Sequence, residues 1–224
     1  SAFAAIACVA ILAYFYHIKN ILGNNSNISF KSLDEKSQFR NLTVLCLVYS
    51  FTFGSELAVV SFFCQFLQST FGLSIVQAGF FGGTFALMNL ITRPSGGWLS
   101  DFFGRKKTLA FLIFGSLVCY KLMGDIDSNW SLEAAIVVSV LCSIFLQAGN
   151  GACFAIAPII NKNYSGQIAG IIGAYGNIGA VGFLIVFSFI ETSSFFYMLS
   201  GFGLFIFFSL YFLDFLSEKH HSLT

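Results

Sequence analysis

Long apolar stretches separated by short polar segments form the main pattern along this chain. Seven of them reach or approach the roughly 20 residues that an α-helix needs to cross a bilayer. They are residues 2–18, 41–70, 76–99, 108–124, 133–160, 166–190 and 194–215. The strands of a transmembrane barrel would alternate in hydrophobicity over about ten residues, and these runs do not alternate. The pattern therefore predicts an all-α transmembrane fold with seven membrane-spanning helices.

The polar segments carry an uneven charge. One side of the predicted membrane collects most of the lysine and arginine residues: Lys19, Lys31, Lys36, Arg40, Arg105, Lys106, Lys107, Lys162 and Lys219. The other side has Lys121 together with four carboxylates, Asp125, Asp127, Glu133 and Glu191. Because positive loops face the cytoplasm, we expect the first span to begin outside the cell and the C-terminus to be cytoplasmic.

Composition narrows the class of protein. Hydrophobic residues make up 57% of the 224 residues and charged residues 9%, against about 25% charged in soluble domains. A net charge of +1 offers no basic field for nucleic acid. Three histidines and six cysteines without a C-x-x-C pair favour neither a metal site nor an enzyme. These features indicate a polytopic membrane protein without a cofactor.

Two charged residues fall inside predicted spans, each at an insertion cost of roughly 2.5–3.5 kcal/mol. Arg93 lies in 76–99 and Glu56 in 41–70. Counted from the predicted cytoplasmic ends, their depths differ by about 13 Å at 1.5 Å per residue, which argues against a direct ion pair. Arg93 could snorkel to the interface. We favour an inward-facing ligand for an anion.

Three asparagines share one depth. Asn89, Asn150 and Asn177 lie about ten or eleven residues from the cytoplasmic ends of their spans, which is about 15 Å and half of the hydrocarbon thickness. They could fasten the helices together by hydrogen bonds. Because Arg93 lies at nearly the same level, we favour a polar cavity.

Helical spacing adds aromatic residues to this layer. Tyr49 and Phe53 are four residues apart on one helix face, and Asn89 and Arg93 are four apart on another. The span 166–190 is rich in glycine, at Gly166, Gly170, Gly173, Gly176, Gly179 and Gly182. These small residues allow close helix packing, contact of a substrate with the backbone, or movement of a gate.

The segment from Gly97 to Lys107 reads as a tight cytoplasmic loop. We expect Asp101 to cap the following helix at its positive N-terminal end, and Gly104 to permit the turn. The basic triplet that begins at Arg105 holds the loop on the cytoplasmic face. Gly97, Asp101, Gly104 and Arg105 are therefore candidates for a structural or gating loop.

The loop pattern G-x-L-x-D-x-x-G-R-K is similar to the signature loop between the second and third helices of each six-helix half in the major facilitator superfamily. Phe102 departs from that pattern, since many members carry a basic residue there. FGSELAVVSFFCQF (53–66), FALMNLITRPSGGWLSD (85–101) and GQIAGIIGAYGNIGAVGF (166–183) resemble the nitrate/nitrite porter branch.

The resemblance implies a division of the chain. Residues 1–18 would be the last helix of an N-terminal half, 19–40 the central cytoplasmic loop, 41–217 the C-terminal six-helix bundle and 218–224 a cytoplasmic tail. The chain would then need an N-terminal half that lies outside this sequence. It would work in the plasma membrane as a multi-pass protein.

The resemblance also implies a substrate site. Members of this branch hold nitrate between two arginines, one from each half, and between aromatic rings. By motif position Arg93 is the arginine of this half, with Asn89 one turn away and Tyr49 and Phe53 as the aromatic pair. We expect the site to include Asn150, Gly176 and Asn177 as well.

The implied function is secondary active transport of nitrate or nitrite by alternating access, with proton coupling. Some members instead exchange nitrate for nitrite, and another anion is a further alternative. Glu56 is the candidate proton carrier, or else a structural hydrogen-bonding partner. A seven-helix receptor is the alternative from another class, and the last span lacks the lysine that a retinal protein needs.

Overall fold

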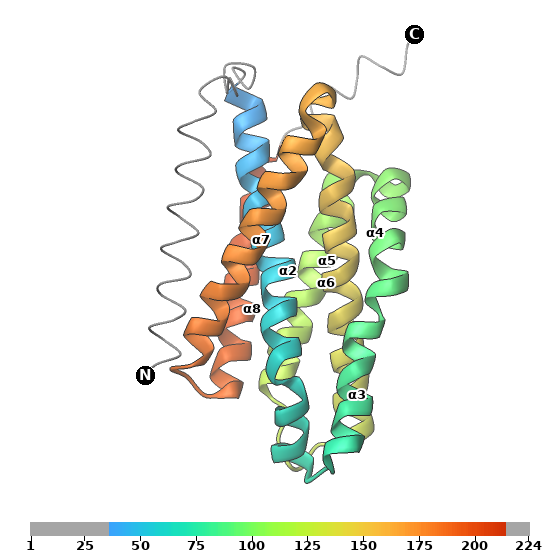
Figure 1. Cartoon of the computed structure of the whole chain (residues 1–224), viewed down its shortest axis with the longest axis vertical. Coiled ribbons are helices and arrows are strands. Elements are labelled where there is room, and N and C mark those ends of the chain that lie inside the picture. Colours follow the sequence, from blue (N-terminus) through green and yellow to red (C-terminus); the bar gives the residue numbers. More distant parts are fainter. Residues whose placement is uncertain (1–35, 214–224) are drawn as a thin grey trace. The chain divides into compact units, whose positions relative to one another are not determined.

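The computed structural model describes residues 36–213, and within this range every element is helical. The helices are α2 (Lys36–Phe71), α3 (Ile75–Leu87), α4 (Asn89–Phe103), α5 (Arg105–Gly124), α6 (Leu132–Ile160), α7 (Ser165–Phe187) and α8 (Thr192–Ser209), with short 3₁₀ turns η2 (Lys162–Tyr164) and η3 (Leu210–Phe212). Figure 1 shows them running alongside one another. The predicted all-α transmembrane fold is confirmed.

Six segments of the described range are long and apolar enough to cross a membrane, and α3 and α4 together form one of them, Ile75–Phe103. Each of the six corresponds to one of the predicted spans after residue 40. The first predicted span, 2–18, lies outside the described residues, as do most of the linker 19–40 and the tail 218–224.

Local sequence fixes where several helices begin. Ser74 and Gln77 form a capping box at the start of α3: the Gln77 N–H donates to Ser74 Oγ at 3.3 Å, and the Ser74 N–H donates to Gln77 Oε1 at 3.1 Å. Ser131 caps α6 by accepting from the Ala134 N–H at 3.2 Å. Gly72, with φ of +65°, allows the turn between α2 and α3.

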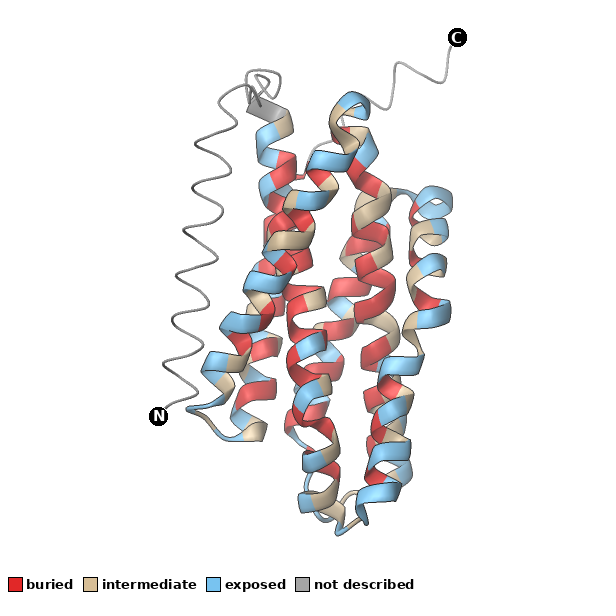
Figure 2. Cartoon of the chain, viewed as in Figure 1, coloured by how far each residue is buried: buried red, intermediate tan, exposed pale blue. Residues whose placement is uncertain are grey.

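Buried positions gather along α2, α5 and α6, as Figure 2 shows. In contrast, α3, α4 and α7 expose more of their side chains. Among the helices that follow α2 in the chain, the most extensive packing is between α4 and α6, between α5 and α6, and between α5 and α8. The helix that carries Arg93 is therefore supported by α6 from one side.

Glycine allows α4 and α6 to touch through their backbones. A Cβ atom on Gly151 would collide with the carbonyl oxygen of Arg93, and one on Gly96 would collide with the backbone of Ala148. The helix α7 approaches α2 in the same way, because a Cβ on Gly54 would lie 2.8 Å from the backbone nitrogen of Ala180. Close backbone packing of this kind is typical of membrane helices.

The glycines of α7 divide into two groups. Gly176 and Gly179 meet α2, whereas a Cβ on Gly166, Gly170, Gly173 or Gly182 would have no neighbour within 4 Å.

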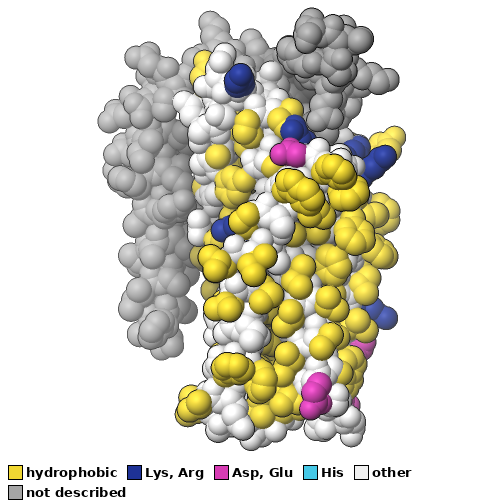
Figure 3. All heavy atoms as spheres, turned by 90° about the vertical axis from the view of Figure 1, so that its right-hand side faces the viewer, with side chains coloured by type: hydrophobic (Ala, Val, Ile, Leu, Met, Phe, Trp, Pro, Cys, Tyr) yellow, Lys and Arg dark blue, Asp and Glu magenta, His cyan; other side chains and the backbone are white. Residues whose placement is uncertain are grey.

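Charge follows the pattern expected from the loops: in Figure 3 most visible basic side chains lie towards one end of the bundle and most visible acidic ones towards the other.

Candidate functional site

The span that carries Arg93 is broken. Between α3 and α4, Met88 lies outside both helices, and the carbonyl oxygen of Phe85 accepts hydrogen bonds from two side chains of α6, Ser143 Oγ at 2.5 Å and Gln147 Nε2 at 2.9 Å. Side chains that enter the backbone ladder in this way are a known cause of kinks. The predicted span 76–99 corresponds to Ile75–Phe103, and the break at Met88 lies within it.

Arg93 and two aromatic residues of α2 form a cluster. The Arg93 Nη2 donates to the hydroxyl oxygen of Tyr49 at 2.9 Å, and the guanidinium carbon lies 5.5 Å from the centroid of the Phe53 ring. The Tyr49 and Phe53 rings are stacked, with centroids 5.0 Å apart and planes at 6°. Phe154 of α6 meets Tyr49 edge-on at 4.9 Å. The structure thus brings together three residues that the helical spacing grouped.

This cluster borders a cleft of about 810 Å³, whose lining includes Asn89, Arg93, Gly97, Gly151 and Phe154. The Nε of Arg93 is buried and has no hydrogen-bond partner among residues 36–213. Within the same residues Arg93 forms no ion pair with a carboxylate. Arg93 lines the cleft, and its Nη2 is bonded to Tyr49. A guanidinium has five N–H donors, so others besides this bond can serve an anion.

Behind the cleft, Glu56 is enclosed by amide groups. Its Oε1 accepts from Asn89 Nδ2 at 3.3 Å and from Gln147 Nε2 at 3.2 Å, and its Oε2 accepts from Asn150 Nδ2 at 2.6 Å. The residue is 4% exposed. Each oxygen of the buried carboxylate is thus hydrogen-bonded, as burial of such a group requires.

These contacts correct the predicted depth of Glu56. Counting from span ends placed it well beyond the asparagines, yet it bonds to both Asn89 and Asn150. The count left five residues, about 7.5 Å at 1.5 Å per residue, between the levels of Glu56 and Asn89, and the two side chains span that distance to meet. The expected absence of a direct pair with Arg93 agrees with the geometry.

The remaining predicted ligands occupy three different environments. Asn150 is fully buried, is bound to Glu56 and leaves its Oδ1 without a partner in the described range. Gly176 packs against the aromatic pair, because a Cβ there would lie 2.5 Å from the Tyr49 ring. Asn177 is exposed, and its amide donates to the Gly173 carbonyl of its own helix at 3.0 Å. Of the three, only Gly176 contacts the aromatic cluster around Arg93.

Sequence analysis missed Gln147. It is fully buried, and besides its bonds to Phe85 and Glu56 its Oε1 accepts from Thr92 Oγ1 at 2.9 Å. The available signal was a polar amide three residues before Asn150, in the otherwise apolar span 133–160.

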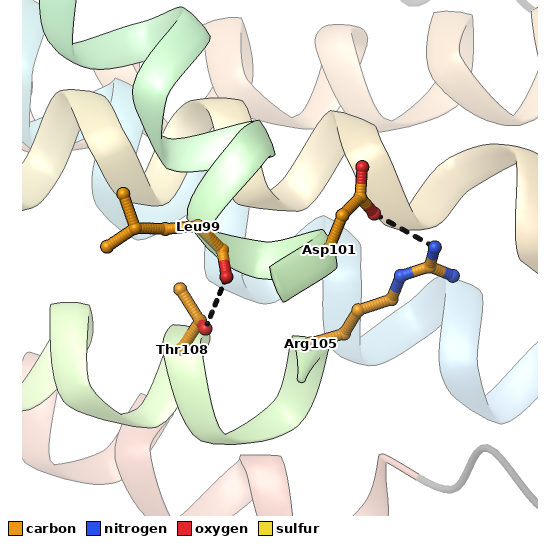
Figure 4. Close-up of polar contacts among 4 residues, drawn as sticks. All are labelled: Leu99, Asp101, Arg105 and Thr108. Atoms are coloured by element: carbon orange, nitrogen blue, oxygen red, sulfur yellow. Dashed lines mark hydrogen bonds and ion pairs between the residues drawn. The ribbon is translucent and has the colours of Figure 1, made fainter. Parts of the chain in front are cut away.

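The loop between α4 and α5 differs from its prediction in one respect (Figure 4). Asp101 does not cap α5, which has no side-chain cap. It forms an ion pair with Arg105, four residues later, at 2.9 Å. The Thr108 Oγ1 donates to the Leu99 carbonyl at 3.3 Å and joins the two helices. The carboxylate reaches the guanidinium rather than the helix end because Gly104, not Asp101, occupies the N-cap position.

Gly104 makes the turn, as predicted, with φ of +92°. Beyond it, the Nζ of Lys106 donates to the carbonyl oxygens of Tyr211 at 3.1 Å and Leu213 at 2.7 Å. A cation at this position satisfies carbonyls that the end of η3 leaves free. Lys106 thus fastens the start of α5 to the end of the last span.

We expect Gly104→Ala to destabilise the protein by about 1–3 kcal/mol, because the residue must keep a backbone conformation that a Cβ disfavours. A Cβ there would meet no atom within 4 Å, so the loss of stability would come from backbone strain alone and not from a steric clash. Thermal unfolding in detergent measures it.

The matched control is Gly83→Ala, at an exposed glycine inside α3 that has no positive φ and also has open space around it. Alanine favours a helix by up to about 1 kcal/mol over glycine. Equal destabilisation by the two changes would contradict the assignment of strain to Gly104.

No group of three or more His, Cys, Asp or Glu residues in the range 36–213 could hold a metal ion. The donors that the described site offers are one guanidinium, a phenol and amides, which suit a small oxyanion rather than a cation.

Comparisons with known proteins agree with this chemistry. The family model of the Major Facilitator Superfamily matches residues 1–184. The chain is 44% identical over 165 residues to the nitrate/nitrite transporter NrtP of Nostoc punctiforme, covering 73% of this chain and 33% of that protein. It is 41% identical over 162 residues to NrtP of Picosynechococcus (72% and 30%). It is 37% identical over 145 residues to nitrate transporter 2.2 of Chlamydomonas reinhardtii (61% and 28%). The chain thus spans about a third of the length of the curated relatives it matches.

Proposed function

The chain belongs to the Major Facilitator Superfamily, in its nitrate/nitrite porter family, and from this we propose that it takes part in secondary active transport of nitrate or nitrite. The described bundle holds one substrate site of a multi-pass membrane transporter. The plasma membrane is its location, with the C-terminus in the cytoplasm, because the basic loops gather on that side.

One observation carries the proposal: a guanidinium on a cleft inside the membrane bundle, held by Tyr49 and Phe53 and not neutralised by a direct carboxylate partner among the described residues. Nitrate is a flat, delocalised monoanion. Two N–H groups of Arg93 can donate to two of its oxygens in one plane. Asn89, one turn away on the same cleft, lies where it can meet the third oxygen.

We propose further that residues 41–217 are the C-terminal half and act with an N-terminal half, of which residues 1–18 are the last helix and 19–40 the connection. The length of the relatives supports this division. The second half would supply a second arginine and an aromatic residue. Rocking of the two halves around a midplane site would expose Arg93 to each side in turn.

Uptake against a negative-inside potential requires about 2.3 kcal/mol per charge per 100 mV. Inward movement of protons with nitrate supplies that energy, and we propose proton-coupled uptake. Exchange of nitrate for nitrite is the second candidate, supported by the absence of a carboxylate among the described residues that line the cleft beside Arg93. Both use the same site.

Reconstitution tests the proposed substrate. The full-length transporter, meaning this chain joined to its N-terminal half, is placed in liposomes under an inward proton gradient. We expect uptake of labelled nitrate that nitrite inhibits and that sulfate, a dianion of different shape, does not. Entry of protons with nitrate indicates symport, and uptake that requires internal nitrite indicates exchange. Sealed liposomes that take up neither anion would contradict the proposal.

A further inference from the structure

We infer that Gln147 is a positioning residue for the anion site, which joins α3 to α4 across their break and so sets where Asn89 and Arg93 lie. This inference rests on the proposed function, because the site it positions is the anion cleft. It assigns Gln147 no contact with the substrate.

The hydrogen bonds of Gln147 reach both sides of the break. Its Nε2 donates to the carbonyl oxygen of Phe85, in the last turn of α3, at 2.9 Å. Its Oε1 accepts from the Oγ1 of Thr92, in the first turn of α4, at 2.9 Å, and the same hydroxyl lies 2.7 Å from the Met88 carbonyl oxygen, so the two acceptors share its one hydrogen. One amide on α6 thereby fastens the two half-helices to the same point of a third helix.

The backbone hydrogen bonds at the break differ on its two sides. The Met88 N–H donates to the Thr84 carbonyl at 3.3 Å, which is long, whereas the Met88 carbonyl accepts from the Thr92 N–H at 2.9 Å and from the Ile91 N–H at 3.2 Å. Met88 itself keeps helical angles, with φ of −57° and ψ of −24°. The side-chain bonds from α6 therefore add to a backbone ladder that is weakened only at the Met88 N–H.

The same amide also reaches the group that holds Asn89. The second N–H of Gln147 donates to Glu56 Oε1 at 3.2 Å, and that oxygen also accepts from Asn89 Nδ2 at 3.3 Å. Arg93 follows Thr92 directly. Gln147 is therefore linked to both polar residues of α4 that line the cleft: to Asn89 through the shared acceptor Glu56, and to Arg93 through its sequence neighbour Thr92.

Gln147 acts through these neighbours rather than on the anion. It is fully buried and is not part of the cleft lining. Its two amide hydrogens and its oxygen are all engaged, so it has no donor left for a substrate. Loss of its bonds should therefore alter how well the anion is held, through the placement of α4.

The test compares variants of the full-length transporter in liposomes. We expect Gln147→Leu to raise the KM for nitrate at least tenfold while protein still reaches the membrane. Thr92→Val keeps the shape of the side chain but removes the hydroxyl, and with it both the bond to Gln147 and the bond to the Met88 carbonyl. We expect it to raise the KM at least fivefold. Thr92→Ser restores the hydroxyl and should return the KM to within twofold of the wild-type value.

Ser143→Ala is the matched control. Ser143 donates to the same Phe85 carbonyl at 2.5 Å, but its hydroxyl makes no described bond to α4 or to Glu56. We expect its KM to stay within twofold of wild type. Equal KM increases for Ser143→Ala and Gln147→Leu, or an unchanged KM in both Gln147→Leu and Thr92→Val, overturn the inference.

Amide hydrogen exchange of residues 86–93 gives a readout that does not depend on transport. We expect faster exchange there in Gln147→Leu and Thr92→Val, and wild-type exchange in Thr92→Ser and Ser143→Ala. Unchanged exchange in the first two variants overturns the inference whatever the substrate. Failure of the wild-type protein to move nitrate would instead contradict the proposed function. If Gln147→Leu does not fold, Thr92→Val decides.

Discussion

Arg93→Lys is expected to lower nitrate uptake by the full-length transporter at least a hundredfold. The change keeps the positive charge, so long-range attraction of the anion persists. It removes the planar fork that can grip two nitrate oxygens at once, and a lysine ammonium is a compact point charge. It also removes the geometry that places one N–H on Tyr49 and the cation against the Phe53 ring. Initial rates of labelled nitrate uptake measure the loss.

Folding must be separated from binding in this experiment. Arg40→Lys makes the same exchange at an exposed arginine in α2, and it should leave uptake within twofold of wild type. Membrane abundance and thermal unfolding should match the wild-type protein for both variants. Uptake at the wild-type rate by Arg93→Lys would remove Arg93 from the substrate site.

The helical spacing paired the residues of the cleft cluster within each helix, and the depth count set the two pairs at similar levels. Tyr49 and Phe53 share one face of α2, and Arg93 shares a face of α4 with Asn89, because residues four apart point the same way on any α-helix. The two faces meet in the structure, where Arg93 bonds to Tyr49 and covers Phe53. This part of the site depends on short-range helical geometry, which the sequence determines directly.

The buried layer behind the cluster was not predictable in the same way. Its members come from three helices and meet through their side chains, so a count of residues along each span does not show which of them touch. The link between the two sides of Met88 comes from Gln147 of α6, which lies more than fifty residues away in sequence from both of its partners there. Gln147 had no partner that its own span could reveal. Tertiary contacts of this kind become visible only when the helices are placed together.

The prediction that Asp101 caps α5 was wrong for a different reason. An aspartate before a helix can cap it or pair with a cation four residues later, and both contacts satisfy the carboxylate. Spacing alone allows either one. In the structure Gly104 holds the N-cap position and Arg105 is within reach, so the ion pair forms.

The site therefore has two layers with separate tasks. In the outer layer the Arg93 guanidinium lies on the cleft with the Tyr49 and Phe53 rings against it. In the inner layer the amides around Glu56 hold the helix that carries the cation. Because the amides occupy the carboxylate, Glu56 does not neutralise Arg93 by direct contact. A buried polar network of this type is stable only while every member keeps its partner.

Glu56→Leu is therefore expected to destabilise the whole bundle. It removes the shared acceptor of Asn89, Gln147 and Asn150, and each buried amide that loses its acceptor costs about 1–3 kcal/mol. We expect a lower apparent Tm in detergent and a large fall in membrane abundance. A variant with wild-type stability would contradict the structural role of this carboxylate.

Glu56→Gln is the matched variant, and it also tests proton coupling. The Oδ1 of Asn150 has no partner in the described range, so rotation of the Asn150 amide would let this oxygen accept from the new NH₂ group, while the remaining oxygen of residue 56 keeps Asn89 and Gln147. We therefore expect near-normal stability. Because the hydrogen-bonding role survives the change, we also expect nitrate-driven proton entry within twofold of wild type. If proton entry is lost while nitrate exchange persists, Glu56 carries the coupling proton and the structural interpretation is wrong.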